Sequence, residues 1–138
     1  MKESQISDCI KCDLPKIHNP AGNITAVNNF QEVPFSIKRV YYLYDVPGGE
    51  ERGGHAHKAL RQLIVAASGS FEVVLDDGRN KKSFTLSQPY IGLVLPPGIW
   101  RELVNFSSGA ICLVLASEEY SENDYLRDYD QFLKYKGV

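Results

Sequence analysis

The most informative segment of this chain runs from Gly49 to Gly69 and reads GEERGGHAHKALRQLIVAASG. Its second half, Gln62–Ala67, combines β-branched and small apolar residues, which is typical of a strand. Gly54–His57 is predicted to form the strand before it. Residues two apart in a strand project to the same face, so His55 and His57 either both enter the protein interior or both leave it.

Glycine and proline punctuate similar short runs along most of the chain. Asp76–Asn80 is predicted to form a tight hairpin turn, because Gly78 accepts the positive φ that such turns need. About nine short strands at hairpin spacing predict an all-β protein, a sandwich or closed barrel of the jelly-roll kind. The predicted strands are Ile24–Asn28, Phe35–Asp45, Gly54–His57, Gln62–Ala67, Phe71–Asp76, Lys82–Leu86, Tyr90–Leu95, Glu102–Asn105 and Ala110–Ala116.

The C-terminal segment has a different pattern. Glu122–Lys136 is predicted to form a helix that Ser121 caps. Its apolar and aromatic residues recur at helical spacing, and charged residues lie on the opposite side. We expect this helix to pack on the outside of the barrel, and the alternative is a contact with a partner subunit. The apolar face would consist of Tyr125, Leu126, Tyr129, Phe132 and Leu133.

Length and charge limit the function classes. A chain of 138 residues fits one domain, which we place at residues 17–138 after an N-terminal leader, residues 1–16. The 15 basic and 17 acidic residues are spread along the chain, with a net charge of −2. Such a distribution disfavours nucleic acid and membrane surfaces as partners. No apolar run approaches the roughly 18 residues that a membrane span needs, so we expect a cytoplasmic protein.

The cysteines agree with a reducing compartment. Cys9, Cys12 and Cys112 are an odd number without the spacing of a disulfide framework. Cys9 and Cys12 do form a CxxC pair, a pattern that also occurs in redox and zinc sites. No further zinc ligands accompany the pair, and we favour a mobile N-terminal segment instead.

The spacing of the glycines and histidines is that of the first cupin motif. Gly49 is followed after five residues by His55, and His57 after four residues by Gln62. Pro96-Pro97-Gly98, with Arg101 and Asn105 at the right distances, matches the later part of the second cupin motif. These two motifs predict a cupin barrel and place the histidine pair inside it.

Two positions in these motifs argue against a metal. Metal-binding cupins complete the site with a carboxylate at the position of Gln62 and a third histidine at the position of Arg101. Here a neutral amide and a permanent cation take their places, and both are poor partners for a divalent ion. We therefore expect no metal and no other cofactor. An imidazole without a metal titrates near neutral pH, which suits acid/base catalysis by His55 and His57.

The chain resembles a known family, the nucleoside-diphosphate-sugar 3,4-ketoisomerases. The resemblance rests on IKRVYYLYDVPGGEERGGHAHKALRQLIVAASGSFEVVLDDG, VLPPGIWRELVNFSSGAICLVLAS and DYLRDYDQFLKY. These are non-metal cupins that act on dTDP-4-keto-6-deoxyglucose in the synthesis of deoxyamino sugars. The resemblance implies conversion of this substrate to a dTDP-3-keto-6-deoxyhexose through an enediol. It also implies a homodimer, often with exchanged N-terminal strands.

The implied reaction assigns roles to further residues. Arg39, Arg52 and Arg61 are candidates for the substrate diphosphate. Trp100 is a candidate for the wall of the sugar pocket, and Arg101 for stabilising the enediolate. Alternation along one strand separates Tyr42 and Tyr44 from Tyr41. The sequence leaves open which face meets the site, and we assign Tyr42 and Tyr44 to substrate binding.

Three other functions remain open for a cupin of this kind. The first is a 3,5-epimerase of 4-keto nucleotide sugars, which also removes a proton next to a ketone but whose motif lacks the HAH doublet. The second is a cupin that binds a nucleotide sugar without turnover, since fold alone does not imply catalysis. The third is a metal-dependent dioxygenase or isomerase, which Gln62 and Arg101 disfavour.

Overall fold

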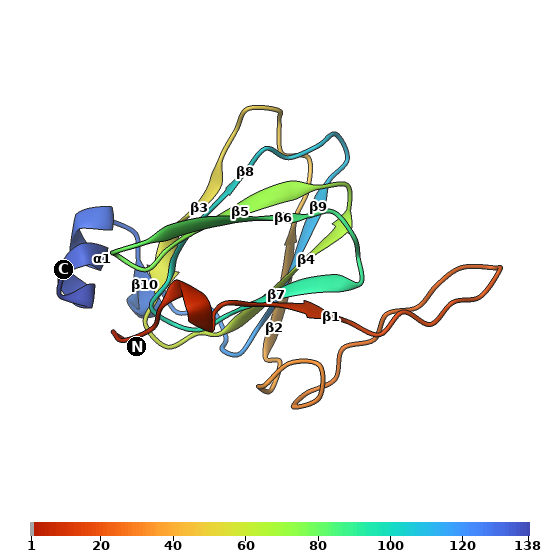
Figure 1. Ribbon diagram of the computed structural model, residues 1–138, viewed down its shortest axis with the longest axis horizontal. Helices are drawn as coiled ribbons and strands as arrows, with labels where there is room; N and C mark the ends of the chain where they lie inside the picture. The colour runs from red at the N-terminus through yellow and green to blue at the C-terminus, as the bar shows by residue number, and fades with distance from the viewer. Residues whose placement is uncertain (1) are drawn as a thin grey trace.

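The protein consists of two antiparallel five-stranded sheets that face each other, as a computed structural model describing residues 2–138 shows (Figure 1). The first sheet has the order β1-β7-β4-β9-β2 and the second has the order β10-β3-β8-β5-β6. The first sheet contains β1 (Ile10–Asp13), β7 (Ile91–Leu95), β4 (Gln62–Ser68), β9 (Ile111–Ala116) and β2 (Arg39–Leu43). The second contains β10 (Tyr125–Leu126), β3 (Arg52–His57), β8 (Trp100–Val104), β5 (Phe71–Asp76) and β6 (Lys81–Leu86).

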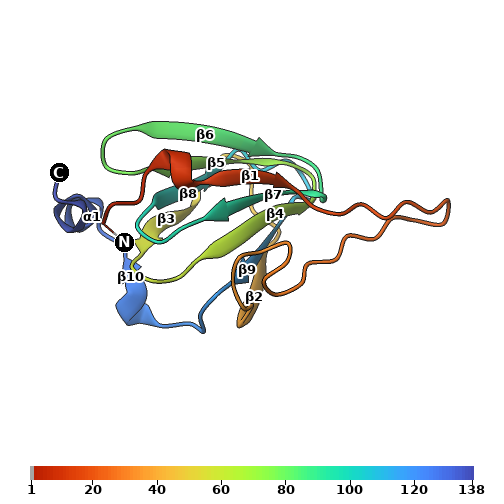
Figure 2. The same cartoon turned by 60° about the horizontal axis from the view of Figure 1, so that its bottom comes forward.

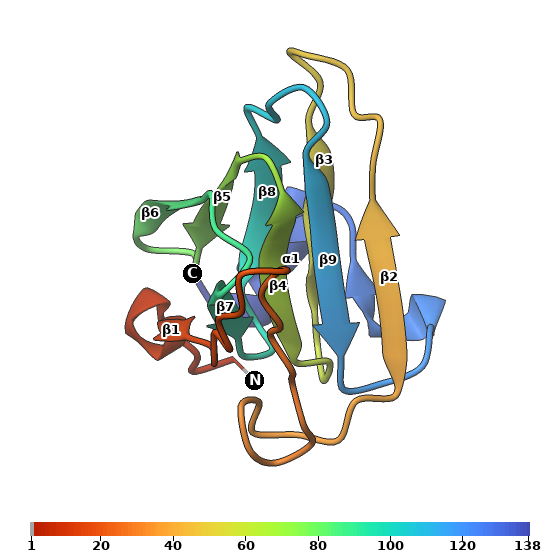
Figure 3. The ribbon, with the colours of Figure 1, turned by 90° about the vertical axis from the view of Figure 1, so that its right-hand side faces the viewer.

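The main core lies between the two sheets, whose face-to-face arrangement Figures 2 and 3 show from two directions. It is built from alternate residues of each strand, such as Ile64 and Ala66 of β4 and Val73 and Leu75 of β5, all of which are buried. Alternation therefore gives each strand one apolar inner face. The predicted turn at Asp76–Asn80 is confirmed: it joins β5 to β6, and Gly78 has a φ of 95°. The predicted all-β class is confirmed as well.

Both outer faces carry a second layer of packing. Leu63 and Val65 of β4 point out of the barrel and are covered by Leu14 and Phe35, which belong to the long segment between β1 and β2. On the other sheet, the helix α1 (Tyr129–Lys136) packs Phe132 against Trp100 of β8 and Leu126 of β10. The expected packing of the C-terminal helix on the outside of the barrel is confirmed. No described helix is long and apolar enough to cross a membrane.

The segment between β1 and β2 departs from the prediction. Part of it projects away from the barrel as an extended arm on the side opposite α1 (Figures 1 and 2). Ile17 and Ile24 form an isolated antiparallel bridge there, and the strand predicted at Ile24–Asn28 is absent from the described residues. The prediction of this strand was wrong, because these residues have β propensity but no neighbouring strand of the same chain to pair with.

The N-terminal residues belong to the barrel. A 3-10 helix at Ile6–Asp8 leads into β1, which pairs with β7 from Ile10↔Val94 to Asp13↔Ile91. Residues 10–13, which we expected in a leader, therefore form an edge strand. Cys9 is buried in the main core, whereas Cys12 packs with the outer cluster that contains Leu63. The two thiols of the CxxC pair lie on opposite sides of the sheet, which argues against a shared disulfide or zinc ion.

The C-terminal segment also differs from the single helix that we predicted. Residues Glu122–Asp124 form a 3-10 helix, and Tyr125 and Leu126 pair with His57 and Ala56 as β10. The helix begins only afterwards, where the Asp128 side chain accepts a hydrogen bond from the backbone N–H of Asp130. The prediction failed because Tyr125 and Leu126 gain backbone hydrogen bonds at the open edge of β3, a long-range interaction that outweighs helical periodicity.

Candidate active site

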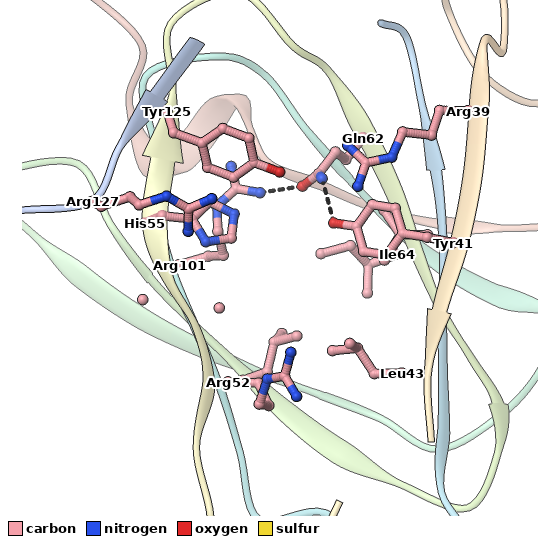
Figure 4. A pocket seen from close by; sticks show the side chains of 14 residues that line it. Arg39, Tyr41, Leu43, Arg52, His55, Gln62, Ile64, Arg101, Tyr125 and Arg127 are labelled. Carbon is pink, nitrogen blue, oxygen red and sulfur yellow. Dashed lines mark hydrogen bonds between the residues drawn. The ribbon is translucent and has the colours of Figure 1, made fainter. Parts of the chain in front are cut away.

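A cavity of about 370 Å³ opens between the two sheets (Figure 4). Strand alternation explains its lining, because β2, β4 and β3 each contribute residues two apart. The cavity holds one histidine, two tyrosines, one amide and four arginines among apolar side chains. The residues that line it are Arg39, Tyr41, Leu43, Arg52, Gly53, Gly54, His55, Gln62, Ile64, Arg101, Leu103, Val114, Tyr125 and Arg127.

The histidine pair lies on the inner face of β3. His55 lines the cavity, while His57 is fully buried directly behind it, with 4.8 Å between the two ring centroids. The Tyr125 ring packs against both imidazoles, at 5.0 Å from His55 and 4.4 Å from His57. The prediction that both histidines enter the interior is confirmed. The two rings therefore pack edge to face, with His55 at the cavity and His57 in the wall behind it.

Asp124 holds the ring of His57. Its Oδ2 lies 2.9 Å from His57 Nδ1, and its two oxygens also accept hydrogen bonds from the backbone N–H groups of Ala59 (2.7 Å) and Leu60 (3.4 Å). A carboxylate only accepts, so His57 Nδ1 carries the proton. His57 Nε2 is then the basic nitrogen, and it is buried without a hydrogen-bond partner among residues 2–138. This unpartnered acceptor lies in the wall behind His55, and an unpaired buried nitrogen of this kind is a candidate for a role in proton transfer.

Both imidazoles are neutral at physiological pH, and their pKa values lie below the near-neutral range that we expected from the sequence. Burial and the nearby Arg101 guanidinium lower the pKa of His55 to about 3. The same two causes lower the pKa of His57 well below its usual range. Neutral imidazoles can take up a proton, so the pair begins in the state that a general base requires.

These pKa shifts predict that acid destabilises the fold. The unfolded chain binds protons at both histidines below about pH 6.5, whereas the folded protein does not, so the free energy of unfolding falls as the pH falls. Each histidine adds up to about 1.4 kcal/mol per pH unit to this slope. Urea unfolding of the protein and of His55→Asn between pH 7 and pH 5 measures the difference. If the free energy of unfolding depended on pH in the same way in both proteins, His55 would titrate normally in the folded state.

A hydrogen-bonded row of three side chains crosses the inner wall of the cavity. Arg101 is buried, its Nε and Nη2 donate to the carbonyl oxygen of Ile99, and its Nη1 donates to Gln62 Oε1. Gln62 Nε2 donates to the Tyr41 hydroxyl at 2.9 Å. Burial lowers the pKa of Arg101 to about 10, so it remains a cation at neutral pH. The row supplies a fixed positive charge beside the histidines.

Three further arginines surround the cavity. Arg39 stacks over the Tyr41 ring with its guanidinium carbon 4.6 Å from the centroid, and Arg52 lies at the opposite end (Figure 4). Arg127 stacks on Tyr125 at 4.1 Å and forms an exposed ion pair with Glu122 at 2.6 Å. Cations gathered around one opening favour an anionic ligand such as a diphosphate.

Four residues that we assigned to substrate binding lie outside this cavity. Tyr42 and Tyr44 are largely exposed, because Arg39, Tyr41 and Leu43 occupy the inner face of β2. Trp100 points outward to α1, since its neighbour Arg101 points inward and strand alternation separates the two. Arg61 is exposed before β4 and reaches the carbonyl oxygen of Pro34. The structure thus brings together His55, His57, Arg39, Arg52 and Arg101 from the predicted set.

The site contains residues that our sequence assignment missed. Tyr41 entered only the argument on strand alternation, and Gln62 only the argument against a metal. Asp124, Tyr125 and Arg127 were predicted to belong to a helix. Tyr125 and Arg127 are two residues apart, a spacing that places them on one side of an extended segment. That signal was present, but the helical periodicity of the following residues hid it.

The donor set does not suit a metal ion. Gln62 and Arg101 occupy the wall beside His55, and residues 2–138 contain no group of three His, Cys, Asp or Glu side chains arranged to hold a metal. A divalent ion here would meet two imidazoles, of which one is fixed to Asp124, and a guanidinium that repels it. The arrangement suits proton transfer by His55 and His57 next to a fixed cation.

The family model described as "FdtA: WxcM-like, C-terminal" matches residues 7–137 of this chain. A protein of Aneurinibacillus thermoaerophilus named TDP-4-oxo-6-deoxy-alpha-D-glucose-3,4-oxoisomerase is 48% identical over 123 residues, which cover 89% of this chain and 88% of that protein. The chain belongs to the FdtA family of 3,4-ketoisomerases. The resemblance that the motifs indicated is confirmed.

Solved structures of family members share the fold. The 3,4-ketoisomerase of Helicobacter canadensis is 46% identical, with a TM-score of 0.92 over 95% of this chain and 98% of that chain. A mutant ketoisomerase of Thermoanaerobacterium thermosaccharolyticum, solved in complex with TDP-4-keto-6-deoxyglucose, is 35% identical. Its TM-score is also 0.92, over 94% of each chain. The predicted cupin-type barrel is therefore confirmed for a chain of this family.

Proposed function

We propose that this protein converts dTDP-4-keto-6-deoxyglucose to a dTDP-3-keto-6-deoxyhexose by proton transfer between C3′ and C4′. The observation that carries the proposal is the neutral His55/His57 pair at a cavity with a buried cation and three arginines. Its relatives at 48% and 35% identity support the substrate, since one is named for this 3,4-isomerisation and the other was solved with the 4-keto sugar nucleotide.

The reaction divides into two proton movements. His55, at the cavity wall, removes the proton from C3′, and the electron pair moves to the C4′ oxygen to give an enediolate. His57, through its free Nε2, passes a proton between the oxygens at C3′ and C4′. His55 then returns its proton to C4′, so that both residues end in their starting state. Arg101 stabilises the negative charge of the enediolate, because it is a fixed cation in a low-dielectric wall.

The nucleotide diphosphate is the second feature that the site must hold. Arg39, Arg52 and Arg127 line the cavity and bring positive charge to a diphosphate, and Arg127 directs its Nε and Nη2 donors to Glu122 in the absence of ligand. The rings of Tyr41 and Tyr125 carry two of these guanidinium groups and limit their motion. We place the sugar beside the histidines and the diphosphate at the arginines.

Proton NMR of dTDP-4-keto-6-deoxyglucose incubated with the protein in D₂O tests the proposal. A 3,4-ketoisomerase gives new signals of a 3-keto sugar, with deuterium at C4′ wherever His55 exchanges its proton with solvent before returning it. A 3,5-epimerase would keep the ketone at C4′ and exchange the protons at C3′ and C5′. A binding protein would change no signal of the sugar beyond line broadening. Either of the last two results would contradict the proposed reaction.

Chelation is expected to leave turnover unchanged. Residues 2–138 contain no group of three His, Cys, Asp or Glu side chains that could hold a metal, the Asp124 carboxylate is bonded to His57 Nδ1, and Arg101 repels a divalent ion. The rate is measured before and after treatment with EDTA followed by gel filtration. A turnover rate that falls after EDTA treatment and is restored by adding one particular metal ion would contradict this prediction.

We also propose that the protein acts as a homodimer in the cytoplasm. Ile17 and Ile24, which bridge each other in the segment between β1 and β2, are 57% and 62% exposed, and Val40 and Tyr42 on the outer face of the edge strand β2 are 55% and 58% exposed. Apolar exposure on this scale favours a partner surface. In our proposal the N-terminal arm of one copy is exchanged onto its partner. Light scattering after gel filtration tests the dimer, and a monomer at micromolar concentration would contradict it.

A further inference from the structure

One of the arginines at the cavity already holds a carboxylate. Arg127 donates from Nε to Glu122 Oε1 at 2.6 Å and from Nη2 to Glu122 Oε2 at 2.9 Å, so two parallel hydrogen bonds join the side chains. The Tyr120 hydroxyl donates to the same carboxylate. Among residues 2–138, neither Arg39 nor Arg52 forms an ion pair with a carboxylate. Of these three arginines, only Arg127 therefore begins with a bound anion.

A second contact holds the Arg127 guanidinium without help from Glu122. Its central carbon lies 4.1 Å from the centroid of the Tyr125 ring (Figure 4), and Tyr125 is fixed by strand pairing with His57. Stacking on an aromatic face limits the motion of a guanidinium. Arg127 lines the cavity, whereas Glu122 is exposed and lies outside the lining. The Nε and Nη2 edge of Arg127 is thus turned to a group outside the cavity.

We propose that Glu122 competes with the substrate diphosphate for the Nε and Nη2 donors of Arg127, and that ligand binding separates the ion pair. This inference rests on the proposed function, which places the diphosphate at the arginines, and it names a residue that sets how tightly the diphosphate is held. A diphosphate can displace the carboxylate, because it carries more negative charge and can contact several arginines at once. Exposed ion pairs are weak in water, so the pair opens at little cost.

The ion pair acts both in the empty site and in the release of product. Without ligand, four arginines surround one cavity, and Glu122 neutralises one of them. Substrate and product carry the same nucleotide diphosphate, so a site that binds it too tightly would retain the product. When the ligand leaves, Glu122 takes back the donors of Arg127. Glu122 therefore lowers the affinity of the site and speeds the exchange of ligand.

Glu122→Gln tests the competition, because glutamine keeps the shape of glutamate but has no charge to hold Arg127. We expect the dissociation constant for TDP, measured by calorimetry, to fall about threefold, an effect of the size that an exposed ion pair allows. KM should fall by a similar factor without a rise in kcat, because substrate and transition state share the diphosphate. If Glu122 instead positioned Arg127 for the ligand, TDP would bind more weakly to this variant.

Two controls separate the competition from the general effect of removing one negative charge. Glu119→Gln changes an exposed glutamate that forms no ion pair among residues 2–138, and it should leave the TDP affinity nearly unchanged. In an Arg127→Gln background, Glu122→Gln should no longer tighten TDP binding, because the contested donors are gone. A threefold gain that persists without Arg127 would show that Glu122 acts only through its charge.

The outcomes for this inference and for the proposed function differ. Turnover by the unmodified protein, with unchanged or weaker TDP binding in Glu122→Gln, overturns the inference alone. TDP binding without turnover, with tighter binding in Glu122→Gln, overturns the proposed reaction and supports the competition at Arg127. An unmodified protein that binds no TDP overturns both.

Discussion

Replacing His55 with asparagine is expected to lower kcat by about 10² or more while the substrate still binds. Asparagine is close to histidine in size and hydrogen bonding, but it cannot take a proton near neutral pH. His55 lines the cavity, and its lowered pKa makes it a neutral base in the free protein. The His57→Asn variant should lose product formation to a similar extent, because the proton could no longer pass between the two sugar oxygens.

Solvent exchange separates the roles of the two histidines. In D₂O, His55→Asn should lose both product formation and exchange of the C3′ proton, since no base removes that proton. His57→Asn should still exchange the C3′ proton while it forms little product. Proton NMR of the substrate measures both quantities in one sample. Near wild-type rates in both variants would show that neither histidine is catalytic. If His57→Asn lost exchange of the C3′ proton and His55→Asn kept it, the two roles would be reversed.

Changing Asp124 to asparagine is the second change with a large expected effect, a loss in kcat of about 10² or more. The two carboxylate oxygens of Asp124 accept hydrogen bonds from Ala59, Leu60 and His57. Asparagine has one oxygen, and the short bond from the Ala59 N–H (2.7 Å) should claim it. Its NH₂ group would then face His57 Nδ1, move the ring proton to Nε2 and remove the base.

Two measurements distinguish this tautomer change from a loss of folding. Nitrogen NMR of the His57 ring should show the proton on Nε2 in Asp124→Asn and on Nδ1 in the unmodified protein. Asp128→Asn is the matched control, because asparagine caps helices as well as aspartate does, and the rate should stay unchanged. An Asp124→Asn protein with full activity would show that His57 does not need this partner.

Local patterns were sufficient for much of this protein. Turn residues and alternating runs located most of the strands and the hairpin at Gly78, because strand formation in a two-sheet barrel follows the two-residue period. The same period placed His55 and His57 on one face, and the cupin spacing placed that face inside. The residue types at positions 62 and 101 also argued against a metal before any geometry was known.

The tertiary structure decided which of two alternating faces meets the cavity. Tyr41 faces inward and Tyr42 outward, and Arg101 faces inward and Trp100 outward. The sequence contains both members of each pair. Alternation shows that the two members lie on opposite faces, but it does not show which face points inward. The packing of the sheets decides which face points inward, because it buries one face of β2 and β8 against the other sheet and leaves the second face for solvent or α1.

Asp124 and Tyr125 depended entirely on long-range pairing. Their local sequence favours the start of a helix, but β3 has an open edge and a buried imidazole that needs a partner. Pairing of Tyr125 with His57 satisfies the edge, and the Asp124 carboxylate satisfies the ring nitrogen. The contact between Asp124 and His57 joins residues 67 apart in sequence, so no local pattern predicts it. Sequence was therefore enough to identify the histidine pair, whereas the carboxylate that sets its tautomer emerged only once the chain had folded.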